Sequence, residues 1–509
     1  MVKINTAVLD GIEGKAVTVE VEISNGIPSF IVIGLGDQII KEAGERIKNA
    51  ILSSGFAYPK GKIVVNLSPA DIRKKGSQME LAVAIGILAA SGQINPRIAE
   101  GIGFFGELSL NGELLATDGF LPMALALKQN GVSRFISPEY SGNQWSFMKE
   151  GWHFAFSLEE VVLILTKGVI EIKEKDCPNP SNEKDMDAET FGAFDFNQVK
   201  GQEEAKRAIT VAAAGCHNML MVGSPGAGKT MLAKRIPTIL PELTEEELME
   251  VLPIYSAMGK EMGSFGMRPF RAPHYKISQY GLIGGGIGPM PGEITLAHRG
   301  VLFMDELGEY APSVLDSLRT PLEEKKVTLN RRGNNYTFPA DFLLVAATNP
   351  CKCGNFGSDK KQCLCSAQDI ARYKRKLLSP VTDRIHIHVY VPNISYEDYK
   401  GQSEMDSATM RDMVLKAREI QARRYENLPI SFNSQLEGKY LHQFCKLDEA
   451  AQDVLEVAYN NLNLSPRSLE NILKVSRTIA DIKGKENIAM DEILEALSYR
   501  GLDKIYGKE

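Results

Sequence analysis

The stretch Gly223-Ser-Pro-Gly-Ala-Gly-Lys-Thr230 decides the fold of the largest part of this chain. It fits the G-x-x-x-x-G-K-[ST] pattern at every fixed position, between an apolar run at 218–222 and a helical segment. Glycines let backbone N–H groups close around a phosphate, and the helix N-terminus adds its positive end. We expect Lys229 to contact the β- and γ-phosphates of a nucleotide and Thr230 to bind Mg²⁺. The expected loop contacts are Gly223, Ser224, Pro225, Gly226, Ala227, Gly228, Lys229 and Thr230.

Composition is that of an ordinary globular protein. The 509 residues predict about three or four domains, and 44% of them are hydrophobic. No apolar run approaches a membrane span, and residues 1–6 lack the core of a signal peptide, so we expect a cytoplasmic protein without a membrane partner. The net charge of −6 gives no global sign of nucleic-acid binding, so any such contact must be local.

Polar side chains follow two further apolar segments. Asp305 and Glu306 directly follow the apolar segment 300–304, and Asn349 directly follows the segment 341–348. In α/β sheets ligands bind at the carboxyl ends of the strands. We expect Asp305 to hold the water shell of Mg²⁺, Glu306 to orient and polarise an attacking water, and Asn349 to hydrogen-bond that water or the γ-phosphate. With the glycine loop, these residues predict nucleotide hydrolysis.

Residues 1–167 are predicted to form a separate α+β domain. Alternation predicts strands at 16–23, 30–34 and 62–67, and helical spacing predicts helices at 39–53 and 80–91. Residues 74–81 and 106–119 resemble the proteolytic domain of Lon-type proteases, a ribosomal S5 domain 2-like fold. The resemblance places Gln78 and Leu121 where such proteases need a serine and a lysine, so we expect no protease activity.

The rest of the chain is predicted to hold a linker and two more domains. Residues 168–192 are rich in Glu, Lys, Asp, Pro and Ser, which indicates a solvated linker. We expect an ATPase domain with a parallel sheet at 193–395 and an all-α lid at 396–509, where residues 447–462 and 468–483 have helical spacing.

Two segments resemble motifs of AAA+ ATPases. Residues 194–202 resemble the segment that lines the adenine pocket, which implies that Val199, Gly201 and Gln202 hold the base. Ser465-Pro-Arg467 resembles the second sensor motif, which places Arg467 over the phosphates, and Asn349 resembles the first sensor residue.

A more specific resemblance extends over essentially the whole chain. Arg268-Pro-Phe-Arg-Ala-Pro-His274 and the Gly- and Pro-rich segment 282–298 are similar to the YifB/ComM family of magnesium-chelatase-like AAA+ proteins. The family places an inserted hairpin at 282–298, facing the pore of a hexamer. It also makes Arg384 the arginine finger that reaches the γ-phosphate of a neighbouring subunit. An intrachain pair of Arg384 with Asp383 or Glu306 is the alternative.

Four cysteines lie within fifteen residues, as Cys351-Lys-Cys353 and Cys363-Leu-Cys365. Two C-x-C pairs at this spacing can supply four thiolates to a structural tetrahedral Zn²⁺ site. Disulfides are the main alternative, which a reducing cytosol opposes.

Two local groups of basic residues are candidates for DNA contact. Residues 323–338 predict a hairpin, and residues 319–332 carry five basic and two acidic side chains. Residues 351–384 carry eight basic and three acidic side chains. The candidates are Lys325, Lys326, Arg331, Arg332, Arg372, Lys374 and Arg375. A solvated hairpin face and a basic helix at a subunit interface are the respective alternatives.

Two functions fit these observations. The first is an ATP-driven, ring-forming DNA motor, which the resemblance links to helicase or branch-migration activity on single-stranded or branched DNA during natural transformation. The second is an ATP-powered remodelling subunit that acts on a protein, as the magnesium-chelatase ATPase subunits do. The basic segments favour the first.

Overall fold

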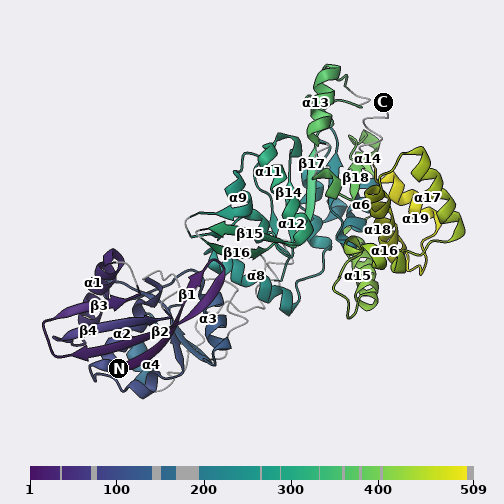
Figure 1. Cartoon of the computed structure of the whole chain (residues 1–509). Coiled ribbons are helices and arrows are strands. Elements are labelled where there is room, and N and C mark those ends of the chain that lie inside the picture. The colour runs from purple at the N-terminus through teal and green to yellow at the C-terminus, as the bar shows by residue number, and fades with distance from the viewer. Residues whose placement is uncertain are drawn as a thin grey trace. The chain divides into compact units, whose positions relative to one another are not determined.

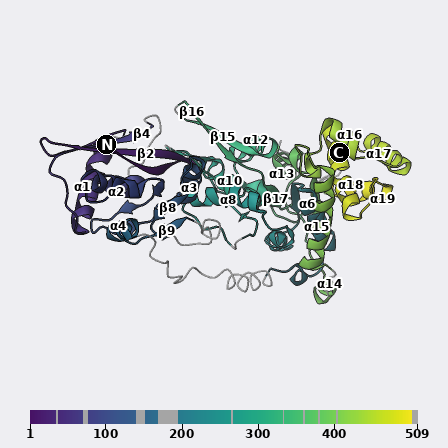
Figure 2. The same ribbon diagram turned by 90° about the horizontal axis from the view of Figure 1, so that it is seen from below.

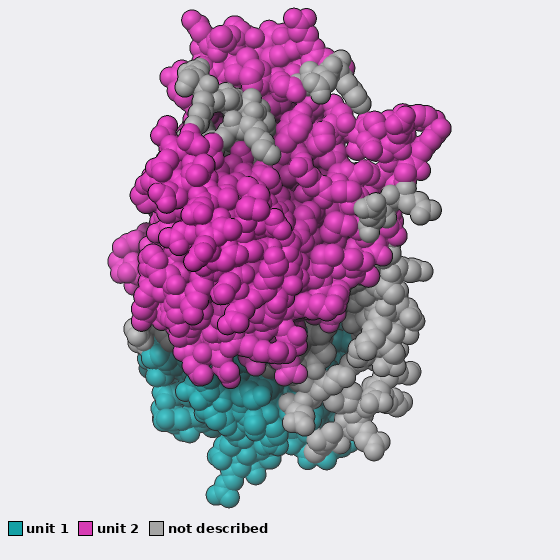
Figure 3. Space-filling model, turned by 90° about the vertical axis from the view of Figure 1, so that its right-hand side faces the viewer, with its two compact units in different colours: residues 1–179, 248–265, 286–291 teal, residues 180–247, 266–285, 292–509 magenta. Residues whose placement is uncertain are grey.

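The computed structural model describes residues 1–34, 37–69, 77–139, 151–167, 194–263, 266–286, 288–331, 333–357, 361–377, 381–401 and 405–500. The described residues belong to two compact units, which Figure 3 shows in different colours. The first unit comprises residues 1–179, 248–265 and 286–291, and the second comprises 180–247, 266–285 and 292–509. The predicted linker, 168–192, lies outside the described residues.

In the described part of the first unit, a mixed seven-stranded sheet has the order β3-β4-β2-β1-β5-β8-β9. Its strands are β1 (Val2–Asp10), β2 (Glu13–Ser24), β3 (Ser29–Ile33), β4 (Lys62–Ser68), β5 (Ile102–Phe104), β8 (Arg134–Ser137) and β9 (Trp152–Phe154). Strands β1, β2 and β4 pair antiparallel, whereas β3 runs parallel to β4, and β5, β8 and β9 continue from β1 in parallel. A small hairpin is formed by β6 (Glu107–Leu108) and β7 (Leu114–Leu115).

The helices of this unit pack on the sheet, and Figure 1 shows α2 and α3 close to β1 and β2. They are α1 (Asp37–Ser53), α2 (Glu80–Ala90), α3 (Phe120–Gln129) and α4 (Leu158–Lys167). Residues 80–89 of α2 are buried all around, because this helix is almost entirely apolar. A Cβ at Gly86 would lie 2.6 Å from Val21 Cγ2, so glycine allows α2 to approach β2 closely.

The two positions that replace the protease residues have structural contacts. The Leu9 N–H donates to Gln78 Oε1 at 3.2 Å, and Gln78 Nε2 donates to the Asp118 carbonyl oxygen at 3.2 Å. The Leu121 side chain is fully buried. Gln78 therefore joins β1 to the segment before α3, and Leu121 belongs to the core.

In the described part of the second unit, an all-parallel five-stranded sheet has the order β11-β14-β17-β10-β18. Its strands are β10 (Met219–Val222), β11 (Phe270–Arg271), β14 (Val301–Met304), β17 (Leu343–Thr348) and β18 (Ile387–Tyr390). The segment expected to hold the inserted hairpin contains two short strands, β12 (Gly284–Gly285) and β13 (Met290–Pro291), of which β13 belongs to the first unit. The predicted basic hairpin is formed by β15 (Lys326–Arg331) and β16 (Asn334–Pro339), which pair antiparallel.

Helices flank this sheet and form the C-terminal region, whereas most of α8 belongs to the first unit. The chain from 203 to 400 contains α6 (Glu203–Gly215), α7 (Lys229–Ala233), α8 (Glu245–Ala257), α9 (Gln279–Ile283), α10 (Glu293–Leu296), α11 (Pro312–Asp316), α12 (Arg319–Glu324), α13 (Ala367–Leu377) and α14 (Tyr396–Lys400). The C-terminal helices are α15 (Ser407–Arg424), α16 (Gly438–Phe444), α17 (Glu449–Asn461), α18 (Pro466–Ile482) and α19 (Met490–Ser498).

The C-terminal helices share one hydrophobic core with the parallel sheet. The cluster contains Val345 of β17 together with Met410 and Val414 of α15 and Ile479 of α18. Helices α15 and α18 both pack on α6, and Figure 2 shows the three together. The expected fold class is confirmed: a multidomain α/β chain with a parallel ATPase sheet and a helical C-terminal region.

Candidate nucleotide-binding and hydrolysis site

The glycine loop connects β10 to α7, and its backbone explains its composition. Gly226 and Gly228 have φ of 82° and 92°, in the left-handed region that residues with a Cβ rarely adopt. A Cβ at Gly223 would lie 2.2 Å from the Val391 carbonyl oxygen, so only glycine fits beside the end of β18. The loop can therefore present its N–H groups to a phosphate without side chains in the way.

The Lys229 ammonium group is folded onto its own loop. Lys229 Nζ donates to the carbonyl oxygens of Gly223 at 2.6 Å and Ser224 at 3.0 Å, and to Asn349 Oδ1 at 3.1 Å. Burial lowers the pKa of Lys229 to about 8, although the charges of Asp305 and Glu306 oppose this shift. Phosphate oxygens are charged acceptors, so a bound nucleotide would offer this group stronger partners than the carbonyl oxygens do.

The oxygen atoms expected to bind Mg²⁺ lie together. Thr230 Oγ1 donates to Asp305 Oδ2 at 2.7 Å, and the Glu306 N–H donates to Asp305 Oδ1 at 2.9 Å. A hydroxyl and a carboxylate beside a phosphate loop are hard oxygen donors, which Mg²⁺ prefers. Glu306 has φ of 53° and an exposed side chain, so the backbone turns immediately after β14 and leaves this carboxylate accessible.

The ends of β10 and β17 meet beside the loop. The Gly223 N–H donates to the Thr348 carbonyl oxygen at 3.2 Å, which joins the end of β10 to the end of β17. Asn349 follows directly and contacts Lys229. The structure thus brings together Lys229, Thr230, Asp305 and Asn349, as the order of the motifs predicts.

The segment expected to hold the adenine base contacts the glycine loop through Gln202. Gln202 Nε2 donates to the carbonyl oxygens of Ala227 at 3.2 Å and Pro392 at 2.6 Å. Within the described residues, the buried Gln202 Oε1 has no hydrogen-bond partner. Val199 is fully buried, and Gly201, with φ of 62°, packs against Ile394. An unused buried acceptor fits the exocyclic amino group of adenine, which is a donor.

Two arginines form a separate group around one carboxylate. Arg384 Nη2 pairs with Glu323 Oε1 of α12, and Arg467 Nη2 lies 3.7 Å from the same oxygen. An intrachain partner of Arg384 is therefore Glu323, a residue that the sequence reasoning missed. The side chains of Arg467 and Glu323 are about half exposed, at 49% and 50%. Both guanidinium groups thus lie near the same carboxylate oxygen, and the Arg384 side chain is only 10% exposed.

Tyr373 of α13 is a second residue that the sequence reasoning missed. Its hydroxyl lies 3.0 Å from Thr348 Oγ1, directly before Asn349. A Cβ at Gly308 would lie 2.6 Å from the same hydroxyl, so Tyr373 also packs closely against Gly308, two residues after Glu306. One side chain of the basic helix thus contacts residues beside both Asn349 and Glu306, which are expected to act in hydrolysis. The sequence shows only a tyrosine within a basic run, which is a weak signal.

We expect Tyr373→Phe to lower the kcat of ATP hydrolysis about fivefold while leaving the KM for ATP nearly unchanged. The ring keeps its packing on Gly308, but one hydrogen bond worth about 1 kcal/mol is lost beside Asn349. Steady-state ATPase rates measure the effect, with Tyr459→Phe on α17 as the control. An unchanged kcat would show that this hydroxyl does not position the strand end.

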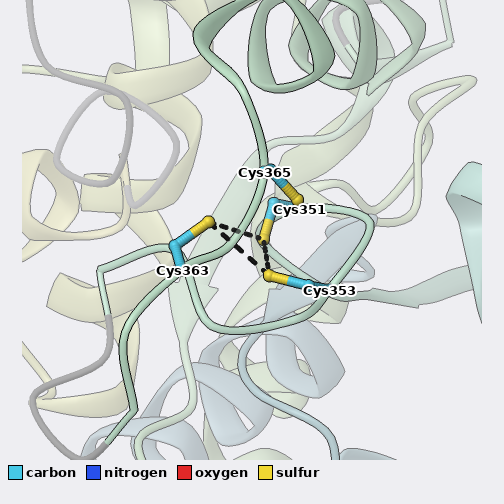
Figure 4. A group of neighbouring side chains, drawn as sticks. All are labelled: Cys351, Cys353, Cys363 and Cys365. Carbon is cyan, nitrogen blue, oxygen red and sulfur yellow. Dashed lines mark hydrogen bonds between the residues drawn. The ribbon is translucent and has the colours of Figure 1, made fainter.

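The four cysteines converge on one point, as Figure 4 shows. Cys351 Sγ lies 3.4 Å from Cys353 Sγ and 3.7 Å from Cys363 Sγ, and Cys353 Sγ lies 3.5 Å from Cys363 Sγ. All four Sγ atoms, including that of Cys365, lie within 4.8 Å of one another. Thiolates at Zn–S distances of about 2.3 Å in a tetrahedron are about 3.8 Å apart, so the donor set fits Zn²⁺. All four are free thiols in the described structure, rather than the alternative disulfides.

The cysteine loop packs against the nucleotide loop. A Cβ at Gly354 would lie 2.4 Å from Pro225 Cδ, and Gly354 has φ of 80°. Cys351 is itself buried and only two residues beyond Asn349. The cysteine loop therefore packs against Pro225 of the nucleotide loop and begins two residues after Asn349.

The candidate DNA contacts lie on two elements. Lys325 Nζ pairs with Asp341 Oδ1 at 3.2 Å, Lys326 Nζ lies 3.7 Å from Glu324 Oε2, and the Arg331 guanidinium lies 5.6 Å from the centre of the Tyr280 ring. Arg332 lies outside the described residues. Arg372, Lys374 and Arg375 are on α13, where Arg372 and Arg375 are exposed. The hairpin lysines are thus neutralised in part by acids, whereas α13 presents an exposed basic surface.

The fold and site define a P-loop ATPase of the AAA+ type. Three segments match families described as "Magnesium chelatase, subunit ChlI" (195–399), "Subunit ChlI of Mg-chelatase" (19–141) and "Magnesium chelatase, subunit ChlI C-terminal" (404–500). The chain is 38% identical to competence protein ComM of Haemophilus influenzae over 507 residues, 98% of this chain and 97% of the relative. It is 36% identical to YifB of Escherichia coli over 510 residues, 99% and 97% of the two chains. The chain therefore belongs to the YifB/ComM family of magnesium-chelatase-like AAA+ ATPases.

A more distant relative matches only part of the chain. The Magnesium-chelatase 67 kDa subunit of Chlorobaculum parvum is 26% identical over 157 residues, 30% of this chain and 23% of the relative. Among the described residues, none of the helices combines the length and the apolar character needed to cross a membrane. The family implies ATP and Mg²⁺ as the ligands of the site.

Proposed function

We propose that this ATPase is a ring-forming DNA motor of the helicase or branch-migration type, acting in the cytoplasm on single-stranded or branched DNA. The observation that carries the proposal is the position of α13. Its Arg372 and Arg375 are exposed in a segment with five more basic than acidic side chains, and Tyr373 of the same helix contacts the strand end that leads to Asn349. A contact of α13 with a phosphate backbone would thus act on an element that touches the hydrolysis site. The name of the Haemophilus relative, a competence protein, supports a role linked to DNA uptake.

The residues of the site take the following roles in this proposal. Lys229 neutralises the β- and γ-phosphates, Thr230 and Asp305 hold Mg²⁺, and Glu306 orients and polarises the attacking water. Asn349 hydrogen-bonds the γ-phosphate or that water, and Mg²⁺ neutralises charge on the phosphates when it is bound.

Arg384 acts on the nucleotide of a neighbouring subunit, and Arg467 lies over the nucleotide phosphates as a second sensor. The role of Arg384 requires a homo-oligomer, and we propose a hexamer. The common partner of the two arginines, Glu323, is half exposed, so a phosphate can compete with this carboxylate for the two guanidinium groups. A guanidinium group stabilises the transferring phosphoryl group because it is always charged and can donate two hydrogen bonds at once.

A protein-remodelling ATPase is the second candidate. The match with the 67 kDa magnesium-chelatase subunit favours it, as do the acids that pair with Lys325 and Lys326. A remodelling subunit has no need of the exposed basic face of α13, which is why we place it second.

The proposal is tested by ATPase rates with and without forked and single-stranded DNA at low salt. We expect DNA to raise the rate and the double reversal Arg372→Glu/Arg375→Glu to remove this stimulation, because both exposed charges would repel phosphates. Arg423→Glu is the control, because this arginine is 77% exposed on α15 and its charge is reversed without touching α13. Failure of every DNA to stimulate the wild-type protein would reject the motor and favour the remodelling subunit.

We also propose that Cys351, Cys353, Cys363 and Cys365 hold one structural Zn²⁺. Metal analysis of the purified protein is expected to find about one zinc per chain, and Cys363→Ser is expected to lose most of it, because three thiolates bind zinc more weakly than four. The melting temperature should fall in the same variant. Cys177→Ser, in the predicted linker, is the control and should retain the zinc. A protein that contains no zinc when purified without chelators would contradict the proposal.

A further inference from the structure

The segment between β11 and α9 contains a pocket that is distinct from the nucleotide site. It has a volume of about 410 Å³ and is lined by Arg271, Ala272, Pro273, His274, Lys276, Ile277 and Glu293. The segment is anchored where the Tyr310 hydroxyl donates to the Pro273 carbonyl oxygen at 2.6 Å. Within the segment, the Lys276 N–H donates to His274 Nδ1 at 3.2 Å, which forms a local turn. The pocket is therefore built on an anchored segment, and its volume lies in the range of small-molecule sites.

One wall of the pocket carries a donor and an acceptor in fixed geometry. Arg271 Nε donates to Glu293 Oε2 at 2.6 Å, and Arg271 Nη2 donates to Glu293 Oε1 at 2.9 Å. Both side chains are only partly exposed, at 29% and 19%. The edge of a nucleobase presents donors and acceptors side by side, so a guanidinium–carboxylate pair is a complementary surface for it.

Aromatic rings and cations alternate beside this wall. His274 and Tyr275 stack with their ring centres 4.3 Å apart, and Lys276 Nζ lies 5.9 Å from the centre of the Tyr275 ring. Three residues beyond Ile277, Tyr280 is 62% exposed beneath the guanidinium of Arg331. Exposed rings next to cations are what unpaired nucleic acid requires, because its bases stack and its phosphates are negative. The Tyr280–Arg331 contact also joins this segment to the basic hairpin β15–β16.

We propose that this pocket binds an unpaired nucleotide of single-stranded DNA. The base lies against His274 with its edge toward Arg271 and Glu293, and the phosphate lies near Lys276. The Tyr280–Arg331 pair receives the next part of the strand on its way to the hairpin. Bases within a duplex are stacked on their neighbours and cannot enter, so the pocket selects unpaired DNA. The inference rests on the proposed function and adds a contact surface outside α13 and the hairpin lysines.

The direct test is ultraviolet crosslinking of the full-length protein to a 20-nucleotide single strand containing 5-bromodeoxyuridine, followed by peptide mass spectrometry. We expect crosslinks in the peptide that contains residues 272–280. Binding of a fluorescent 20-nucleotide oligothymidine, measured by anisotropy, should weaken about 10-fold in His274→Ala and in Tyr280→Ala, because each loses a stacking surface. Melting temperatures show whether each variant is folded, and Lys276→Glu provides a third variant that changes only an exposed side chain.

The chain offers a matched control in Tyr396 of α14. This tyrosine is 72% exposed and has Lys400 Nζ 4.5 Å from the centre of its ring, so it reproduces the exposed ring and cation of Tyr280 elsewhere. Tyr396→Ala should bind the oligothymidine like the wild type. If His274→Ala, Tyr280→Ala and Lys276→Glu also bind like the wild type, the pocket is refuted, while DNA-stimulated ATPase of the wild type would leave the proposed motor intact. Absence of both binding and stimulation in the wild type would reject the two together.

Discussion

Glu306→Gln is expected to bind ATP with nearly unchanged affinity and to hydrolyse it at least about 100-fold more slowly than the wild type. The amide has the size of the carboxylate but cannot polarise water as a charged base does. The backbone at Glu306 is already fixed by its position after β14 and by its N–H bond to Asp305 Oδ1, so the substitution should leave the site assembled. Single-turnover hydrolysis and retention of labelled ATP measure the two effects separately.

Glu309→Gln is the control for this experiment. It makes the same chemical change three residues further on, at an exposed side chain after the same strand. We expect it to hydrolyse ATP like the wild type. Rapid turnover by Glu306→Gln would remove the proposed role of Glu306.

Lys229→Met is expected to reduce ATP hydrolysis by about 100-fold or more, because the variant loses the buried ammonium group that lies within the glycine loop, where the phosphates are expected. Lys234→Met, an exposed lysine at the end of the same helix, should retain activity. Full ATPase activity of Lys229→Met would refute the site itself.

The same variant should change how stability depends on pH. The pKa of Lys229 is about 8 in the folded protein, whereas an ordinary solvent-exposed lysine, as in the unfolded chain, has a pKa of 10.5. Between these values the unfolded chain binds more protons than the folded one, so this lysine makes the nucleotide-free protein more stable as the pH rises from about 8 toward 10. Lys229→Met should lack this contribution in thermal melts over that range, whereas Lys234→Met should keep it.

The parts of the fold that local sequence specifies are predicted well. Glycines with required backbone angles, an apolar strand before them and acids at strand ends define the site residues Lys229, Thr230 and Asp305, which the structure places together. By contrast, β1 is not evident from alternation, because Asn5 and Thr6 interrupt its apolar pattern. The buried Thr6 hydroxyl is accommodated only because it donates to the Phe104 carbonyl oxygen at 2.7 Å in the neighbouring strand.

Contacts between distant segments account for what the sequence does not reveal. Nothing near Glu323 in the chain indicates that it pairs with Arg384 and approaches Arg467. The contact of Tyr373 with Thr348 and the packing of Gly354 on Pro225 likewise depend on how the chain folds back on itself. In each case the two partners are far apart in the sequence, so the pattern of either segment alone does not indicate the contact.

The composition of the first unit has a consequence for how the protein is made. Residues 248–265 belong to that unit, where the Ser256 carbonyl oxygen accepts the Gly119 N–H at 2.8 Å and the Ser256 hydroxyl accepts the Leu121 N–H at 3.3 Å. Residues 286–291 belong to it as well. A chain growing on the ribosome exposes residues 1–179 well before these later segments emerge. The N-terminal unit can therefore complete its native contacts only after part of the ATPase sheet has been synthesised, so the two units must mature as overlapping rather than successive folding events.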